Sequence, residues 1–216
     1  MKMNIIIIKM VKGKFIVIEG LDATGKTTIV PMLSASIDAM ALNCPPKLLD
    51  NKIIDLGVYV NHRSDLRKHF DKQPSIVRRA YYRAANLIAS EQAKKTIETG
   101  KHVVMDRYWT STIAFSVLDK EGPITNIEYG TYPPEMLKPD IMIFLTVDEK
   151  HRSERLRGRG EVFTEEETLI EKEIEKRENV LNIYRKYERV EVDTSMLTPK
   201  EVRDKIILIL KQNKII

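Results

Sequence analysis

Residues 19–28 read EGLDATGKTT and combine the residue types and the spacing that hold phosphate groups. Gly20, Gly25, Lys26 and Thr27 satisfy the pattern G-x-x-x-x-G-K-[ST], between an apolar run and a helical pattern. Glycines let backbone N–H groups turn toward a β-phosphate, and the start of the following helix adds positive charge. The lysine supplies a point charge to the β- and γ-phosphates, and the threonine hydroxyl joins a Mg²⁺ shell. The predicted nucleotide contacts are Gly20, Asp22, Ala23, Thr24, Gly25, Lys26, Thr27, Thr28 and, further along the chain, Arg155.

Asp22 places a carboxylate near the middle of this phosphate-binding loop. The motif alone favours a structural role, in which the side chain hydrogen-bonds to its own loop and fixes the turn. The motif also leaves the reaction open, because switches, motors and kinases share it. A GTPase switch is disfavoured, because the NKII at residues 51–54 lacks the aspartate of an N-K-x-D guanine reader.

A second group of charged residues lies in the run VVMDRYWTS, residues 103–111. Asp106 closes an apolar strand pattern, and Arg107 comes next. Open parallel sheets bind ligands at the carboxyl ends of their strands, so both side chains are expected beside the phosphate loop. There Asp106 would hold Mg²⁺ through water or receive an acceptor's proton, and Arg107 would fork onto a phosphate. A structural Asp–Arg pair that caps the strand is the alternative.

Three alternate arginines, Arg155, Arg157 and Arg159, lie in RLRGRGEVFTEEE, residues 155–167. On a loop hinged by the two glycines, they would close over a transferring phosphoryl group and neutralise its oxygens. An ordinary solvated basic turn is the competing interpretation.

The elements that position these residues follow from apolar runs that alternate with longer helical patterns. These runs are apolar throughout, as expected for strands with helices on both faces of a sheet. The fold class is therefore α/β with a parallel sheet. A short strand and a helix are expected within residues 44–72, and a surface loop over residues 120–139. The predicted strands are KFIVIE, HVVMD, DIMIFLTV and RVEVD, and a helix is predicted over residues 27–40.

Two capping boxes mark the starts of helices in the C-terminal half of the chain. Thr164 pairs with Glu167, and Thr198 pairs with Glu201. Pro199 follows directly at the first helical position, where its missing N–H costs nothing. Helices are therefore predicted to begin just after Thr164 and Thr198.

The composition narrows the partners and the compartment. The chain has 216 residues and a net charge of +5 with both signs plentiful. This predicts a moderately basic surface and not the polycationic field of a non-specific nucleic-acid binder, and phosphate-bearing small molecules suit such a surface equally well. An N-terminal extension at residues 1–13 and a single domain at residues 14–216 are expected. The run of four isoleucines in the extension is too short for a secretion signal or a membrane span. Cys44 is the only cysteine, which fits a reducing compartment, so a cytoplasmic location is expected, with a mitochondrial one left open.

Four stretches resemble the thymidylate kinase family: FIVIEGLDATGKTT, DRYWTS, LKPDIMIFLTV and RLRGRGEVFTEEE. The stretches PSIVRRAYYRAANLIASE and VVMDRYWTSTIAFS look most like its branch of mitochondrial-type UMP-CMP kinases. The resemblance implies a three-layer P-loop kinase, with a five-stranded parallel sheet between helices and a LID at about residues 157–164. It also implies ATP and Mg²⁺ as cofactors and a homodimer formed by helix packing. The implied reaction transfers the ATP γ-phosphoryl group to a pyrimidine nucleoside 5'-monophosphate.

The resemblance also assigns an acceptor site. Arg107 would bind the acceptor phosphate, Asp106 would orient it with Mg²⁺, and Asp22 would turn toward the acceptor sugar. Tyr82 falls where the family stacks an aromatic ring on the pyrimidine. Phe115 falls where an aromatic ring packs near the sugar.

Two departures from the family pattern bear on the acceptor base. Asn86 stands where thymidylate kinases usually carry an arginine, and NCPPKLLD replaces their Arg-Glu-Pro-Gly segment. Asparagine both donates and accepts, so it adapts to cytosine or uracil edges, whereas arginine only donates. UMP, CMP and their deoxy forms are therefore the predicted acceptors, with dTMP as the alternative and a non-catalytic nucleotide-binding regulator as a further one. The predicted catalytic residues are Lys26, Asp106, Arg107, Arg157 and Arg159.

Overall fold

The computed structural model describes residues 11–44, 64–119, 128–158 and 164–216, with the backbone alone described for 64–67. Five parallel strands form one sheet in the order β2-β3-β1-β4-β5. This arrangement confirms the predicted fold class. The strands are β1 (Phe15–Glu19), β2 (Met40–Asn43), β3 (Val103–Asp106), β4 (Ile141–Thr146) and β5 (Val190–Asp193).

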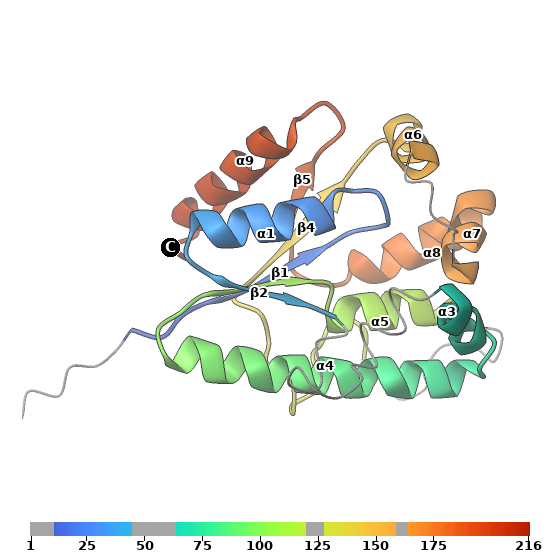
Figure 1. The fold of residues 1–216 in the computed structure, drawn as a ribbon, viewed down its shortest axis with the longest axis horizontal. Coiled ribbons are helices and arrows are strands. Elements are labelled where there is room, and N and C mark those ends of the chain that lie inside the picture. The colour runs from blue at the N-terminus through green and yellow to red at the C-terminus, as the bar shows by residue number, and fades with distance from the viewer. Residues whose placement is uncertain (1–10, 45–63, 120–127, 159–163) are drawn as a thin grey trace, which may run out of the picture.

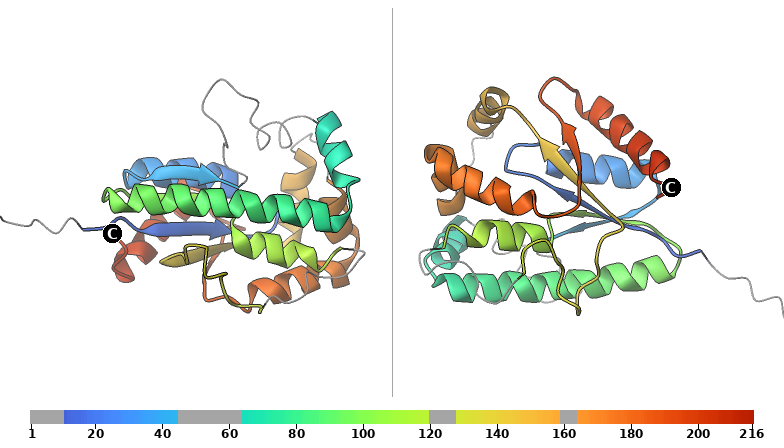
Figure 2. Two further views of the ribbon diagram at one scale, coloured as in Figure 1. Left: turned by 90° about the horizontal axis from the view of Figure 1, so that it is seen from below. Right: turned by 180° about the vertical axis from the view of Figure 1, so that it is seen from behind.

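Helices cover both faces of this sheet (Figure 1). In Figure 1 and in the right view of Figure 2, α1 and α9 lie on one side of the sheet, and α4 and α5 lie on the other. The helices of the described residues are α1 (Lys26–Ser36), α3 (Ser64–Asp71), α4 (Ser75–Glu98), α5 (Trp109–Ser116), α6 (Glu149–Gly158), α7 (Glu165–Lys172), α8 (Ile174–Tyr184) and α9 (Pro199–Gln212).

The central strand β1 shows why the strand patterns are apolar throughout. Phe15 and Val17 point into the core shared with α4, α5 and α8, whereas Ile16 and Ile18 point into the core shared with α1 and α9. All four side chains are fully buried. A strand covered on both faces needs apolar residues at every position, so its sequence does not alternate.

The four predicted strands are present, but the predicted helix over residues 27–40 was too long. Helix α1 ends at Ser36, and Met40 already begins β2, where it pairs with Val103. The chain turns between them at Asp38, which has a φ of 48°. Aspartate tolerates this left-handed conformation better than most residues, so the helix ends without a glycine or proline to mark the place. Strand β2 lies just before residues 44–72, where a short strand and a helix are expected. Helix α3 is present there, whereas residues 45–63 lie outside the described residues, so the expected strand stays a prediction.

Both predicted capping boxes are confirmed. Thr164 and Glu167 bond reciprocally at the start of α7, and Thr198 and Glu201 do so at the start of α9. Pro199 occupies the first position of α9, as predicted. The loop predicted over residues 120–139 is described only from residue 128, and residues 128–139 contain no helix or strand. Where the structure describes a helix, none is long and apolar enough to cross a membrane.

Candidate active site

The phosphate-binding loop lies at the carboxyl ends of the strands, between β1 and α1. Gly20 has a φ of 145°, and a Cβ placed on it would lie 2.5 Å from the backbone oxygen of Leu145 at the end of β4. Only glycine allows the chain to leave β1 so close to its neighbouring strand. Gly25, with a φ of 99°, precedes the first residue of α1. The glycines of the motif therefore have the conformational roles that the pattern predicts.

Lys26 is buried at the first position of α1, with 6% of its surface exposed. Its Nζ donates a 2.7 Å hydrogen bond to the backbone oxygen of Leu21, inside the same loop. Burial, followed by the charge of Arg107, lowers the pKa of Lys26 to about 8, against the opposing attraction of Asp22 and Asp106. The folded protein thus holds a poorly compensated ammonium group in the loop, and an anionic phosphate would supply the missing charge.

Thr27 and Asp106 meet across the site, as the metal prediction requires. The Thr27 hydroxyl donates to Asp106 Oδ2 over 3.3 Å. The other oxygen of this carboxylate, Oδ1, is buried and has no hydrogen-bond partner among the described residues. A hydroxyl and an unsatisfied carboxylate oxygen suit Mg²⁺, which takes few protein ligands and completes its shell with phosphate and water. In the part of the chain that is described, no group of three or more His, Cys, Asp or Glu residues forms a metal site.

Arg107 directly follows β3 and has a φ of 62°, which is unusual for a residue other than glycine. Its N–H still bonds to Ile18 of the neighbouring strand at 3.0 Å, while its side chain turns back toward the loop. The guanidinium donates to the backbone oxygen of Gly20 at 3.2 Å and forms an ion pair with Asp22. It also lies 5.5 Å from the centre of the Phe115 ring. The structure therefore brings together Asp22, Arg107 and Phe115, three of the predicted acceptor residues.

Glu19 belongs to the site but was missed by sequence reasoning. This last residue of β1 is fully buried and accepts hydrogen bonds from the backbone N–H groups of Tyr108 at 3.0 Å and Ser111 at 3.2 Å. It also accepts the Ser111 hydroxyl at 2.6 Å, and Ser111 Oγ in turn accepts a 3.1 Å bond from Arg107. Burial raises the pKa of Glu19. The signal available in the sequence was a carboxylate that closes an otherwise apolar strand.

Asn86 is predicted to contact the edge of a cytosine or uracil base, but its side chain is fully buried. Its amide nitrogen donates to Thr112 Oγ1 at 2.8 Å, and its oxygen accepts the Cys44 thiol at 3.1 Å. Burial raises the pKa of that thiol, so it remains a donor. Asn86 thus joins α4 to α5 and to the end of β2. This packing removes the geometric support for base reading by Asn86 in the nucleotide-free protein.

Tyr82 lies on α4, half-buried within a small aromatic cluster. Its ring meets that of Phe70 edge-on at 5.7 Å and that of Tyr81 at 5.4 Å. Stacking of Tyr82 on a pyrimidine remains a prediction.

The prediction that the three arginines of residues 155–159 share one loop is wrong for two of them. Arg155 and Arg157 belong to α6, where residues two apart face different directions. Arg155 donates to the backbone oxygen of Thr194 at 2.7 Å and to that of Ala23, in the phosphate loop, at 3.4 Å. Arg157 is exposed, and Arg159 lies outside the described residues. Arg155, a predicted nucleotide contact, thus lies against the phosphate loop. Closure of Arg157 and Arg159 over the transferring phosphoryl group remains a prediction.

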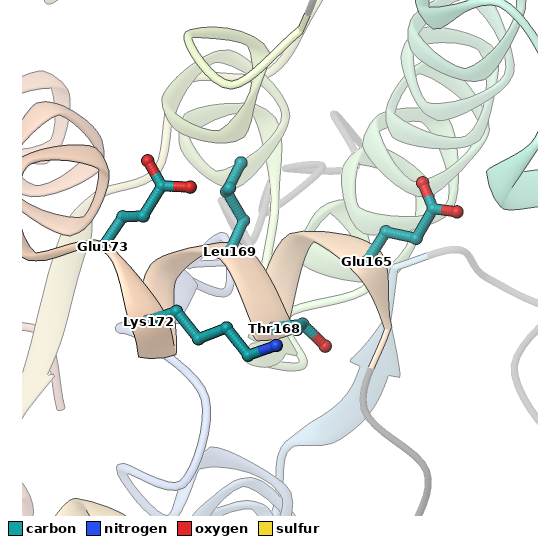
Figure 3. A pocket seen from close by; sticks show the side chains of 5 residues that line it. All are labelled: Glu165, Thr168, Leu169, Lys172 and Glu173. Atoms are coloured by element: carbon teal, nitrogen blue, oxygen red, sulfur yellow. The ribbon is translucent and has the colours of Figure 1, made fainter.

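A shallow hollow of about 360 Å³ lies along α7 (Figure 3). It is lined by side chains of α7 and of the residue that follows it, and it contains none of the predicted site residues. The predicted phosphate-binding residues lie at the carboxyl edge of the sheet and not in this hollow. Its lining residues are Glu165, Thr168, Leu169, Lys172 and Glu173.

Comparisons with known proteins identify the family of this chain. The family model described as thymidylate kinase matches residues 18–206. The chain is 34% identical over 184 residues to "UMP-CMP kinase 2, mitochondrial" of Homo sapiens, a match that covers 82% of this chain but 38% of the human protein. It is 29% identical over 204 residues to "Probable thymidylate kinase" of Methanocaldococcus jannaschii, covering 94% of this chain and 98% of that protein.

Solved structures share the fold. Thymidylate kinase from Candida albicans matches with a TM-score of 0.64 at 20% identity, over 94% of this chain and 93% of that one. Deoxyadenosine kinase from M. mycoides matches with a TM-score of 0.59 at 20% identity, over 92% and 99% of the two chains. Because the family match extends over residues 18–206 of 216, this chain belongs to the thymidylate kinase family and is an ATP-dependent nucleoside monophosphate kinase.

Proposed function

We propose that the acceptor is a pyrimidine nucleoside 5'-monophosphate, with dTMP preferred. The observation that carries the proposal is the Asp22–Arg107 pair beside Lys26. A protein that only binds ATP has no need of a second cationic side chain, Arg107 in addition to Lys26, directed at the same loop. The preference for dTMP rests on the family match and on relatives named "Probable thymidylate kinase", which this chain matches over nearly their whole length.

In this proposal the residues act by position and charge. Lys26 and the loop amides bind the ATP phosphates, and Arg107 forks onto the acceptor phosphate after its pair with Asp22 rearranges. Thr27 and Asp106 would hold Mg²⁺, which would supply positive charge to neutralise the phosphates. An acceptor phosphate oxygen then forms a bond to the γ-phosphorus as the bond to the β–γ bridging oxygen breaks, releasing ADP. Little proton transfer is needed, because the attacking phosphate oxygen is already anionic.

UMP and CMP are the second candidate acceptors. One observation favours them, which is the 34% identity to a protein named UMP-CMP kinase 2. The position of Asn86 no longer adds to this argument, because both sides of its amide are engaged by Thr112 and Cys44. A homodimer and the boundary between an extension at residues 1–13 and a domain at 14–216 are kept as proposals from the resemblance.

A panel of monophosphates tests the acceptor. Purified protein is assayed with ATP, Mg²⁺ and equal concentrations of dTMP, UMP, CMP, dUMP or dCMP, with ADP release coupled to NADH oxidation. We expect kcat/KM to be highest for dTMP, by roughly tenfold, the scale of discrimination that one well-placed group supplies. Higher kcat/KM for UMP or CMP would establish the second candidate. ADP release that no monophosphate raises above the ATP-only background would indicate a non-catalytic nucleotide-binding regulator.

A further inference from the structure

Helix α5 carries Phe115 of the predicted acceptor site and Ser111, which accepts a bond from Arg107. Charged residues from other elements bind both of its ends. At its N-terminal end, Glu19 accepts the N–H groups of Tyr108 and Ser111. At its C-terminal end, Arg79 of α4 donates a 2.9 Å bond to the backbone oxygen of Phe115. A helix dipole favours negative charge at its start and positive charge at its end, so both charges stabilise α5. They also satisfy backbone groups that a helix leaves unpaired at its ends.

Arg79 is almost completely buried, with 3% of its surface exposed. Its guanidinium forms a two-pronged bond with Asp119, with Nε and Nη2 each 2.8 Å from a carboxylate oxygen. Nη2 also bonds at 2.6 Å to Glu166, in the first turn of α7. Burial disfavours the charged form, but the two carboxylates outweigh it and raise the pKa of Arg79. Burying these charges carries a desolvation penalty that offsets much of their attraction, so the cluster is better explained by a role in positioning than by stability alone.

The contacts of Arg79 lead directly to Arg107. The backbone oxygen that Arg79 holds belongs to Phe115, whose ring lies 5.5 Å from the Arg107 guanidinium carbon. Phe115 is 6% exposed, so the ring has little room to move independently of its backbone. A shift at the end of α5 therefore moves the surface on which Arg107 rests. Displacements of about 1 Å can cost roughly 10²-fold in rate when they misplace a reacting group.

We propose that Arg79 is a positioning residue for acceptor binding. It fixes the C-terminal end of α5 and thereby the placement of Arg107 over Phe115. Glu166 on α7 is its partner in this role. The inference rests on the proposed function, because Arg107 is its acceptor-binding group. It adds a residue on α4 that contacts neither ATP nor acceptor in this account.

The test compares Arg79→Lys and Glu166→Gln with a control on the same helix, Lys94→Gln. Lysine keeps the charge beside Asp119 but cannot make the fork and the bond to Phe115 together. We expect Arg79→Lys to raise the KM for the acceptor roughly tenfold and Glu166→Gln to raise it less, with the KM for ATP nearly unchanged. The double variant should be no worse than Arg79→Lys, because both act through one contact. Lys94 forms an exposed ion pair with Glu91, so its loss should change neither constant.

Trp109 gives a readout that does not depend on catalysis. It is the only tryptophan of the chain, it is the first residue of α5, and it is 1% exposed. We expect acrylamide quenching of its fluorescence to increase by roughly twofold in Arg79→Lys, because loosening one end of a short helix promotes local opening.

The outcomes separate the inference from the function on which it rests. Suppose that wild-type protein phosphorylates a monophosphate, but Arg79→Lys changes the KM for the acceptor and the KM for ATP equally, or changes neither. The positioning role is then wrong and the proposed function stands. If wild-type protein phosphorylates no monophosphate, the proposed function is wrong. Unchanged Trp109 quenching in Arg79→Lys overturns the inference in either case.

Discussion

Replacing Lys26 with methionine is expected to slow phosphoryl transfer strongly and, at the same time, to stabilise the nucleotide-free protein. Methionine fills a similar volume but carries no charge for the β- and γ-phosphates. The loss of one preorganised charge at a developing anion lowers kcat by roughly 10²- to 10³-fold. Steady-state assays with ATP and dTMP measure this loss.

The gain in stability follows from the buried charge of Lys26. Its pKa is about 8 in the folded protein, lowered from 10.5, so folding disfavours the ammonium form. One pKa unit corresponds to about 1.4 kcal/mol, which makes the destabilisation a few kcal/mol at neutral pH. Above pH 8 the folded protein releases this proton while the unfolded chain keeps it up to about pH 10.5, so the destabilisation fades over that range.

Thermal unfolding of wild-type and Lys26→Met protein without nucleotide measures the effect. The variant should melt at a higher temperature than the wild type at pH 7, and the difference should shrink between pH 8 and pH 10. Comparing the two proteins at each pH cancels the titration of groups that they share. A variant that is less stable at pH 7, or a difference that does not depend on pH, would contradict the burial of a charged lysine.

Replacing Arg107 with lysine is expected to impair acceptor use and to spare ATP binding. Lysine keeps a positive charge but loses the fork that reaches both Asp22 and the backbone of Gly20. We expect kcat/KM for the acceptor to fall by roughly 10²-fold or more, because this group neutralises charge on a reactant. The dissociation constant for ATP, measured by calorimetry, should change by no more than about threefold, since less than 1 kcal/mol of the binding free energy is then altered.

Arg203→Lys is the matched control for this substitution. Arg203 lies on α9 and forms a surface ion pair with Asp204 at 2.6 Å. Surface pairs of this kind contribute little, so both ATP binding and acceptor use should be unchanged. Equal losses of ATP and acceptor binding in Arg107→Lys would instead assign Arg107 to the shape of the loop.

The parts of the fold that could be predicted are those with a local signal. The buried strand β1 appears as a continuous apolar run, and the helix starts at Thr164 and Thr198 appear as capping boxes. The phosphate loop has its own spacing, and its glycines have the conformations that this spacing implies. Asp106 and Arg107 could be predicted because ligands bind at the carboxyl ends of strands in an open parallel sheet, and the structure places both residues at the end of β3.

The parts that were missed depend on contacts between distant residues. Glu19 bonds to Tyr108, which lies 89 positions away, and Arg79 bonds to Glu166, which lies 87 positions away. Asn86 was read from its place in a family pattern, but its neighbours on α5 and β2 decide where its amide points. Local patterns carry no information about such partners. The end of α1 was misplaced for a different reason, because Asp38 turns the chain without a strong helix-breaking residue.

The central claim is tested most directly by following the phosphoryl group itself. Purified protein is incubated with Mg²⁺, dTMP and ATP labelled with ³²P at the γ-position, and the nucleotides are separated by ion-exchange chromatography. The label is predicted to appear in dTDP, with one ADP formed for each dTDP, and Lys26→Met is predicted to form both products roughly 10²- to 10³-fold more slowly. Label that stays in ATP, or that appears only as inorganic phosphate, when dTMP, UMP and CMP are each supplied would contradict the central claim.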